Sequence, residues 1–246
     1  MPARLTIRLG YFVHFPALRR LLQTFAFATL IASAQLAVAQ APAVPAAPQA
    51  RFVVVLDAAH GGDDAGGHLA NNQLEKNFTL ALSVRLRSLL GARGIQVVTT
   101  RESDATVDAD RRAEIANRAQ AQACLSLHAS GSGAGIHLFA SSLAPVEPVR
   151  FAAWKTAQSA FVTRSLALEG VLNSALTHAG MSVTLGRTSL QGIDSMTCPA
   201  VAVEIAPDLS ADKKTTTNLD DADYQARVAE ALAAALLEWR TEAHQP

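Results

Sequence analysis

Residues 53–62 read Val-Val-Val-Leu-Asp-Ala-Ala-His-Gly-Gly, and the interpretation of the whole chain starts from this stretch. Four consecutive apolar residues predict a β-strand that is buried on both faces. The strand leads through Asp57 to His60, and two glycines follow. Because ligand sites in open α/β sheets gather beyond the carboxyl ends of the strands, His60 is a candidate metal ligand. A turn whose histidine has no functional role explains the same residues equally well. The choice between this interpretation and a metal ligand depends on the rest of the sequence.

Half of the 246 residues are hydrophobic, which is enough to form one good core or two small ones. The net charge is zero, but residues 1–39 carry four arginines and no acidic residue. Without that segment, 17 basic residues stand against 21 acidic ones, a net charge of −4. A mildly acidic body without a basic run does not favour nucleic-acid binding, and we expect no nucleic-acid partner.

The N-terminal segment has the pattern of a secretory signal peptide. Arg19 and Arg20 close a basic region, and residues 21–34 are mostly apolar. Residues 37–39 (AVA) fit the small-residue pattern that precedes a cleavage site, which predicts a signal peptide over residues 1–39. An uncleaved N-terminal membrane anchor is the alternative interpretation.

Residues 40–50 (QAPAVPAAPQA) follow the signal and contain no charge. A segment rich in alanine and proline predicts an extended linker. We therefore expect the folded, catalytic domain over residues 51–240, in a periplasmic or secreted protein.

Apolar strand patterns alternate with helical patterns along this domain. We expect strands at 53–56, 95–100, 123–127, 135–140 and 199–205, and helices at 74–90, 108–122, 151–179 and 221–239. The helical pattern at 151–179 has a possible break at Gly170, and residues 180–192 are of mixed character. The alternation predicts an α/β fold in a single domain, with a central, mostly parallel, twisted sheet of about six strands and helices on both faces.

A second predicted strand also ends in a histidine followed by small residues, His128-Ala129-Ser130. Glu75 lies in the first turn of the helix that follows the His60 loop. Zinc hydrolases hold their metal with three side chains drawn from histidine and carboxylate, and leave the fourth position to water. His60, Glu75 and His128 supply that set, so we expect one zinc ion per chain at these residues.

Glu204 lies in the apolar strand pattern VAVEIA, where an unpaired carboxylate is costly. A glutamate in this setting is either paired with a base or placed for function. A zinc hydrolase needs a second carboxylate to take the proton from the attacking water and pass it to the leaving nitrogen. We predict that Glu204 is this catalytic residue, and that parallel strands bring it to the same sheet edge as His60 and His128.

Five segments together resemble the zinc-dependent N-acetylmuramoyl-L-alanine amidases of the type 3 class, the cell-wall amidases. The first, LDAAHGG at 56–62, is similar to the family's Asp-Pro-Gly-His-Gly-Gly opening. Leu74-Glu75-Lys76 is similar to its Glu-Lys helix start, and RRAEIANR at 111–118 to its Arg-plus-Ala-Asn helix. SLHA at 126–129 resembles its Ser-x-His-Ala segment, and PAVAVEI at 199–205 its Pro-Ala-x-x-x-Glu strand.

The resemblance spans residues 52–240 and implies a function for the candidate site. It implies that His60, Glu75 and His128 bind zinc and that Glu204 is the catalytic carboxylate. The implied reaction is hydrolysis of the lactyl–L-Ala amide bond of peptidoglycan in cell-wall remodelling. The rival interpretations are a non-catalytic peptidoglycan-binding relative and a zinc hydrolase of another exported amide or peptide. We expect a monomer, and the need for a protein activator stays open.

The chain departs from the family pattern before the first histidine, at Ser130, where the family usually has Asn after the His-Ala pair, and at His137. Ala58-Ala59 replaces the Pro-Gly before the first histidine, and we expect a strained or rearranged turn because alanine does not adopt positive φ freely. His137 stands where we expect a carboxylate or a small polar residue, and its apolar neighbours favour an outward strand position over a ligand role. Residues 143–165 are short for the inserted helix that plugs some members' sites, so we expect an open groove.

Four other residues leave two interpretations each. Cys124 and Cys198 can form a disulfide in an exported protein, but each lies beside an apolar run, which favours free buried thiols. Asp57 either orients a metal ligand from behind or caps the turn. Arg187 either holds a substrate carboxylate or is an ordinary surface residue.

Overall fold

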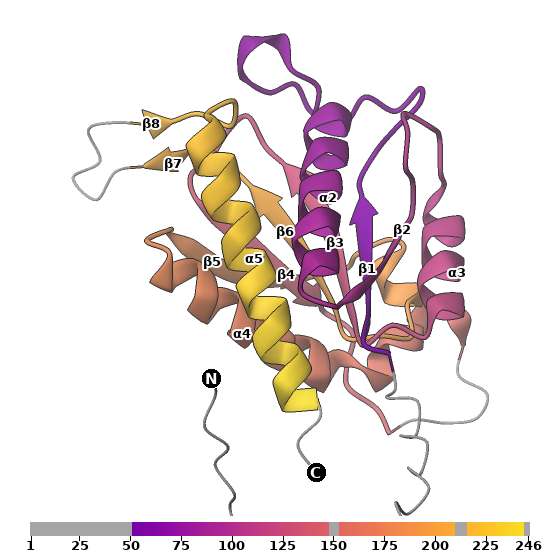
Figure 1. Ribbon diagram of the computed structural model, residues 1–246. Coiled ribbons are helices and arrows are strands. Elements are labelled where there is room, and N and C mark those ends of the chain that lie inside the picture. Colours follow the sequence, from indigo (N-terminus) through magenta and orange to yellow (C-terminus); the bar gives the residue numbers. More distant parts are fainter. Residues whose placement is uncertain (1–50, 148–152, 210–215, 244–246) are drawn as a thin grey trace, which may run out of the picture. The chain divides into compact units, whose positions relative to one another are not determined.

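β1 (Val53–Ala58) lies inside a six-stranded sheet in the computed structural model (Figure 1). The strand order is β2-β1-β3-β6-β4-β5, and β4 runs antiparallel to β6 while all other neighbouring pairs are parallel. The other strands of this sheet are β2 (Gln96–Thr99), β3 (Ala123–Ala129), β4 (Ile136–Ser141), β5 (Val183–Thr188) and β6 (Ala200–Ile205). The predicted mostly parallel sheet of about six strands is confirmed.

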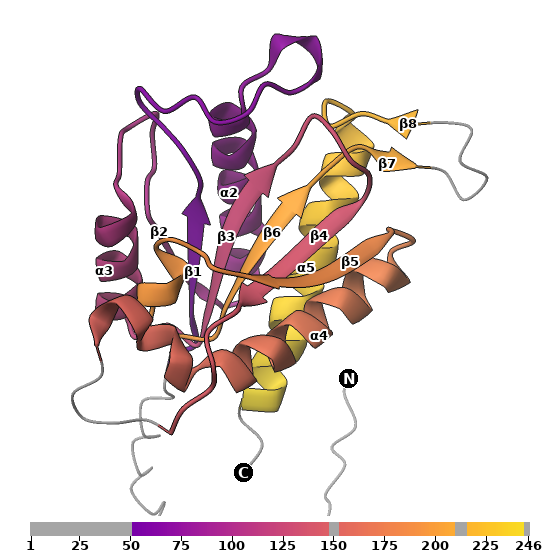
Figure 2. The ribbon, with the colours of Figure 1, turned by 180° about the vertical axis from the view of Figure 1, so that it is seen from behind.

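Helices cover both faces of the sheet, as predicted. α2 (Glu75–Ala92), α4 (Val162–His178) and α5 (Ala222–Ala243) contribute to the larger hydrophobic core, on one face. α3 (Ala109–Ala119) and the short 3-10 helix η3 (Ile193–Ser195) contribute to a smaller core on the other face. Figures 1 and 2 show α2 and α5 in front of one face of the sheet and α3 on the other.

The two faces of the sheet differ in the size of their side chains. Val54 and Leu56 pack into the larger core and Val55 into the smaller one, and none of the three has exposed surface. β1 is therefore buried on both faces, as its apolar run predicts. On the α3 face β6 carries the small residues Ala200 and Ala202, which pack into the smaller core.

The structure describes residues 51–147, 153–209 and 216–243, all within one compact unit, Ala50–Pro246. The signal peptide predicted at 1–39 and the linker predicted at 40–50 lie outside these residues. Within the described part of the chain, every helix is too short or too polar to cross a membrane. Two further short strands, β7 (Asp208–Leu209) and β8 (Thr216–Thr217), pair with each other antiparallel.

Between β4 and β6 one sequence prediction is wrong in detail, and a segment left undefined contains a strand. The helical segment breaks at Phe161, between the 3-10 helix η2 (Trp154–Ala160) and α4, and not at Gly170, which lies inside α4. The apolar face of α4 continues past Gly170 through Val171 and Leu172, so packing against the sheet holds the helix together there. The mixed segment at 180–192 contains β5, an edge strand whose exposed residues mask the strand pattern.

Cys124 and Cys198 form a disulfide, so the expectation of free thiols is wrong. The order of the strands in the sheet explains why the two cysteines meet. β3 and β6 are neighbours that pair Cys124 with Ala200, which brings Cys198, just before β6, to a Cα–Cα distance of 6.2 Å from Cys124. The sequence shows two apolar runs but not that they lie side by side.

Glu169, on α4, makes stability depend on pH. Its side chain is buried, and its Oε1 atom has no hydrogen-bond partner among the described residues. Burial raises the pKa of Glu169 from its ordinary 4.5 to about 7, although a backbone hydrogen bond at Ala140 and the charge of Arg187 oppose this rise. Since the pKa is higher in the folded state, stability is lost as pH rises from about 4.5 to 7 and stays lower above that.

We expect Glu169→Gln to be more stable than the parent by roughly 1–3 kcal/mol at pH 8, since each pKa unit is worth about 1.4 kcal/mol. At pH 4 the parent carboxyl is mostly protonated in both states, so the difference in urea midpoint between the two proteins should be much smaller than at pH 8. Urea unfolding at the two pH values measures the difference. A stability difference that does not change with pH would contradict the expectation.

Candidate functional site

His60, Glu75 and His128 come together beyond β1 and at the end of β3. His60 follows β1, Glu75 is the first residue of α2, and His128 is the last but one residue of β3. The Nε2 atom of His60 lies 3.1 Å from Oε2 of Glu75, and Nδ1 of His128 lies 3.1 Å from Oε1 of the same carboxylate. Ligand atoms of all three residues lie within 4.8 Å of one another, a group that could hold a metal ion.

The turn that carries His60 is unusual in its backbone. His60 has a φ of 61°, in the left-handed region that residues other than glycine rarely adopt. Ala59 does not have a positive φ, and its amide donates to the carbonyl of Leu127 at 3.1 Å, which continues the pairing with β3. The expected strain at Ala58-Ala59 is therefore absent, and the left-handed residue is the candidate ligand itself.

Two buried arginines hold this turn through its carbonyl groups. Arg112, on α3, donates to the carbonyls of Ala58 at 2.7 Å and His60 at 2.8 Å. Arg101, in the loop after β2, donates to the carbonyls of Ala58 at 2.9 Å and Ala59 at 3.0 Å. A strained residue persists only where its surroundings fix it, and these bonds fix both peptide groups that flank the His60 backbone.

Each candidate histidine ligand also has a polar partner on its other ring nitrogen. Nδ1 of His60 lies 2.8 Å from the carboxylate of Asp64. Nε2 of His128 lies 3.4 Å from the Ser126 hydroxyl, which donates to Asp57 at 2.7 Å. These contacts leave Nε2 of His60 and Nδ1 of His128 turned towards Glu75, which is how metal-binding histidines are oriented in proteins.

Asp57 therefore lies behind the site and does not cap the turn. Its carboxylate also pairs with Arg112 at 2.7 Å, and both side chains are about nine-tenths buried. Sequence reasoning missed Asp64, Arg101 and Arg112 as functional residues. The only signal for Asp64 is an acidic residue four positions after His60, and a loop with two neighbouring aspartates makes that signal weak.

Glu75 is ionised despite its burial. Burial alone would raise the pKa of Glu75, but a hydrogen bond with His128, the amides of Gly67 and Ala129, and the charge of His60 lower it to about 2. Gly66 allows the loop to pack onto this pair, because a Cβ at that position would come within 2.8 Å of both the His60 ring and the Glu75 carboxylate. A carboxylate held in this way is ready to bind a cation.

Glu204 lies beside His128 on the neighbouring strand. The two are register partners in the parallel β3–β6 pair, so their side chains emerge side by side on the α3 face. Glu204 is half-buried, and no described residue forms a hydrogen bond or ion pair with its carboxylate. Of the two interpretations of a glutamate in an apolar strand, pairing with a base finds no support among the described residues.

The remaining candidate residues of the sequence are not part of the cluster. His137 is the register partner of Glu204 on β4, but its Nε2 atom contacts the carbonyl of Ala134 at 3.2 Å. Arg187 donates to the carbonyls of Ser141 and Leu143, so its guanidinium holds the chain after β4 and does not face the cluster.

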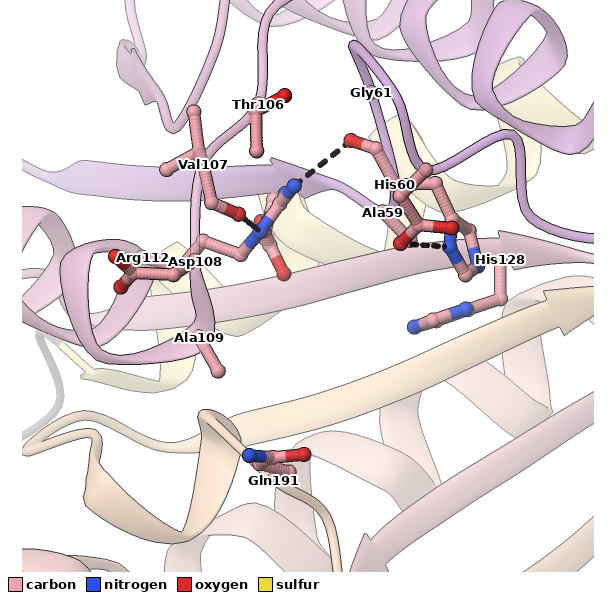
Figure 3. Close-up of a pocket in the computed structure, with 12 residues that line it drawn as sticks. Ala59, His60, Gly61, Thr106, Val107, Asp108, Ala109, Arg112, His128 and Gln191 are labelled. Atoms are coloured by element: carbon pink, nitrogen blue, oxygen red, sulfur yellow. Dashed lines mark hydrogen bonds and ion pairs between the residues drawn. The ribbon is translucent and has the colours of Figure 1, made fainter.

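A pocket of about 400 Å³ opens beside His60 and His128 (Figure 3). Its lining continues from the two histidines past Thr106 to the first turn of α3 and to Gln191. The predicted open groove is consistent with this pocket, although residues 148–152 lie outside the described part of the chain.

One family model matches most of the chain, and several curated proteins match parts of it. Residues 54–238 match the family model described as N-acetylmuramoyl-L-alanine amidase. The amidase AmiA of Escherichia coli (strain K12) is 39% identical over 94 residues, which cover 37% of this chain and 32% of the relative. The amidase Rv3717 of Mycobacterium tuberculosis (strain ATCC 25618 / H37Rv) is 29% identical over 202 residues, which cover 72% of this chain and 81% of the relative.

Solved structures share the fold. The catalytic domain of CwlV, an amidase from Bacillus (Paenibacillus) polymyxa var. colistinus, superposes with a TM-score of 0.59 at 25% identity, over 77% of this chain and 98% of that domain. Ami1 from Mycobacterium smegmatis gives a TM-score of 0.62 at 20% identity, over 78% and 97% of the two chains. The chain spans about a third of the length of the first curated relatives that it matches.

Proposed function

The chain belongs to the N-acetylmuramoyl-L-alanine amidase family, and on this premise we propose that it hydrolyses the amide between the lactyl group of N-acetylmuramic acid and L-alanine in peptidoglycan. The observation that carries the proposal is the His60, Glu75 and His128 group, with Glu204 in register beside it, within the matched residues. A binding module has no need of an unpaired carboxylate beside a metal-binding group.

The three clustered residues fit a catalytic zinc ion. Two imidazoles and one carboxylate are a ligand set of zinc hydrolases, and they leave a position open for water. Zinc bound there supplies a Lewis acid that polarises the substrate carbonyl and lowers the pKa of a water molecule. Asp64 and Ser126 would keep the two imidazole rings in the binding orientation.

Glu204 would move the proton in this reaction. A carboxylate beside His128 can take a proton from the attacking water and then give it to the nitrogen of the departing L-alanine. Its half-buried position keeps it accessible to substrate, and no described residue competes for its oxygens.

We infer an exported enzyme that acts in the periplasm or outside the cell, with residues 1–39 as the signal peptide and 40–50 as the linker. The Cys124–Cys198 disulfide supports this location, because disulfides persist in oxidising compartments. Peptidoglycan lies in the same compartments.

Muropeptide analysis of digested, purified sacculi tests the proposed function. We expect the zinc-loaded protein to release free stem peptides whose new N-terminus is L-alanine, and the freshly purified protein to contain about one zinc per chain. Binding to sacculi without release of peptides, in a protein without metal, would favour a non-catalytic relative. Cleavage at a different bond would favour a zinc hydrolase of another amide.

A further inference from the structure

The pocket beside the candidate metal group has a second wall that the proposed chemistry does not use. Figure 3 shows His60 and His128 on one side, Thr106 and Ala109 on another, and Gln191 across from them. Gln191 comes from the segment between β5 and η3, far in sequence from the other lining residues. Its side chain is exposed and makes no hydrogen bond with any described residue.

The segment that presents Gln191 is held firmly. The buried carboxylate of Asp194 accepts hydrogen bonds from the amide of Leu190 at 3.1 Å and from the hydroxyls of Ser141 at 2.6 Å and Ser189 at 3.1 Å. Gly192 has a φ of 87°, which residues with a side chain rarely adopt, and it lies against Ala109, the first residue of α3. A free amide on a rigid segment is suited to recognising a ligand by hydrogen bonds.

The charges around the pocket select a neutral ligand. Asp64 and Asp108 are exposed at its rim. Arg112 is the only arginine or lysine of the lining. Its guanidinium already donates hydrogen bonds to the carboxylate of Asp57 and to the carbonyls of Val107, Ala58 and His60. Apart from the proposed zinc ion, the lining offers no free cationic side chain to the carboxylates of a peptide stem, and its rim is negative.

We propose that this pocket binds a neutral, N-acetylated sugar ring of the glycan strand, with Gln191 as a specificity-determining residue that hydrogen-bonds its hydroxyl or acetamido groups. The inference rests on the proposed amidase function, since it places the sugar side of the cut bond towards α3 and the peptide side away from it. Thr106 and the carboxylates of Asp64 and Asp108 add further partners for sugar hydroxyls. A volume of about 400 Å³ has room for such a ring with its acetamido group.

Two substrate series test the proposal with the zinc-loaded parent, Gln191→Ala and the control Gln96→Ala, an exposed glutamine on the edge strand β2. One series lengthens the glycan from one to four sugars on a fixed tripeptide, and the other lengthens the peptide on a fixed glycan. We expect Gln191→Ala to raise KM about 3- to 10-fold for the longer glycans, as the loss of one neutral hydrogen bond predicts, with kcat unchanged. Gln96→Ala should match the parent.

A KM effect that follows peptide length, or no effect at all, would overturn the sugar assignment while leaving the amidase function in place. A binding experiment tests the sugar assignment separately from the proposed amidase function. Titration of a peptide-free tetrasaccharide of N-acetylglucosamine, which has the acetamido groups but no lactyl carboxylate, should show weaker binding to Gln191→Ala than to the parent, whether or not the parent cleaves peptidoglycan. A parent that cleaves sacculi but does not bind the tetrasaccharide contradicts the inference, and a parent that binds it but cleaves nothing contradicts the proposed function alone.

Discussion

Glu204→Gln is expected to keep the bound zinc and to lose at least ~100-fold in kcat, the low end for a general acid–base residue. Glutamine has nearly the shape of glutamate but cannot take a proton from water at neutral pH. Glu204 is the register partner of His128, and no described residue holds its carboxylate, so the substitution leaves the strand and the three clustered residues intact. The loss should therefore appear in the rate and not in metal content or stability.

Peptide release from purified sacculi measures the rate, and elemental analysis measures zinc per chain. Glu242→Gln, at an exposed position on α5, is the matched control and should behave like the parent. A Glu204→Gln protein that releases peptides at the parent rate would end the assigned role. Loss of zinc together with activity would also contradict it, because Glu204 would then act on the metal site.

Arg112→Met is expected to lower the free energy of unfolding by about 3–5 kcal/mol, the usual result of removing one partner from a buried ion pair. The substitution leaves Asp57 buried without its counter-charge and removes donors from the carbonyls of Ala58 and His60. His60 then loses part of what holds it at a φ of 61°. We expect zinc affinity to fall by about 10- to 100-fold, as for other residues that orient metal ligands.

The neighbouring residue provides the control. Arg111 is exposed and pairs with Glu114 at 2.5 Å on the surface of α3, so Arg111→Met should cost less than about 1 kcal/mol and leave zinc binding unchanged. Urea unfolding and competition with a zinc chelator measure the two effects separately. If Arg112→Met resembles Arg111→Met in both measurements, the arginine does not support the site.

The architecture could be predicted from the sequence because its signals are local. A run of four apolar residues at 53–56 specifies a buried strand, and alternation with amphipathic helices specifies a layered α/β fold. His60, Glu75 and His128 each stand at the end or start of such an element, so parallel strands suffice to bring them to one edge. Their roles as ligands, and that of Glu204 as the catalytic residue, stay predictions that the experiments above decide.

Other features could not be predicted, because they depend on which segments are neighbours. Arg101 and Arg112 act on backbone carbonyls of a distant turn, and nothing in their own sequence surroundings indicates that contact. The disulfide required knowledge that β3 lies next to β6. Gln191 lines the pocket although it is far in sequence from the other lining residues, on a segment where the Leu190 amide is held by Asp194.

The disulfide also fixes the alignment of the two strands that carry His128 and Glu204. A slip of β6 against β3 by one residue would turn the Glu204 side chain to the opposite face of the sheet, away from His128. The bond joins Cys124, four residues before His128, to Cys198, six residues before Glu204, so it opposes a slip from the pairing that places these two residues side by side. In a reducing compartment the bond does not persist. On the proposed export of the chain, the disulfide would form only after the chain has left the cytoplasm, and it would hold the candidate catalytic residues in register only from then on.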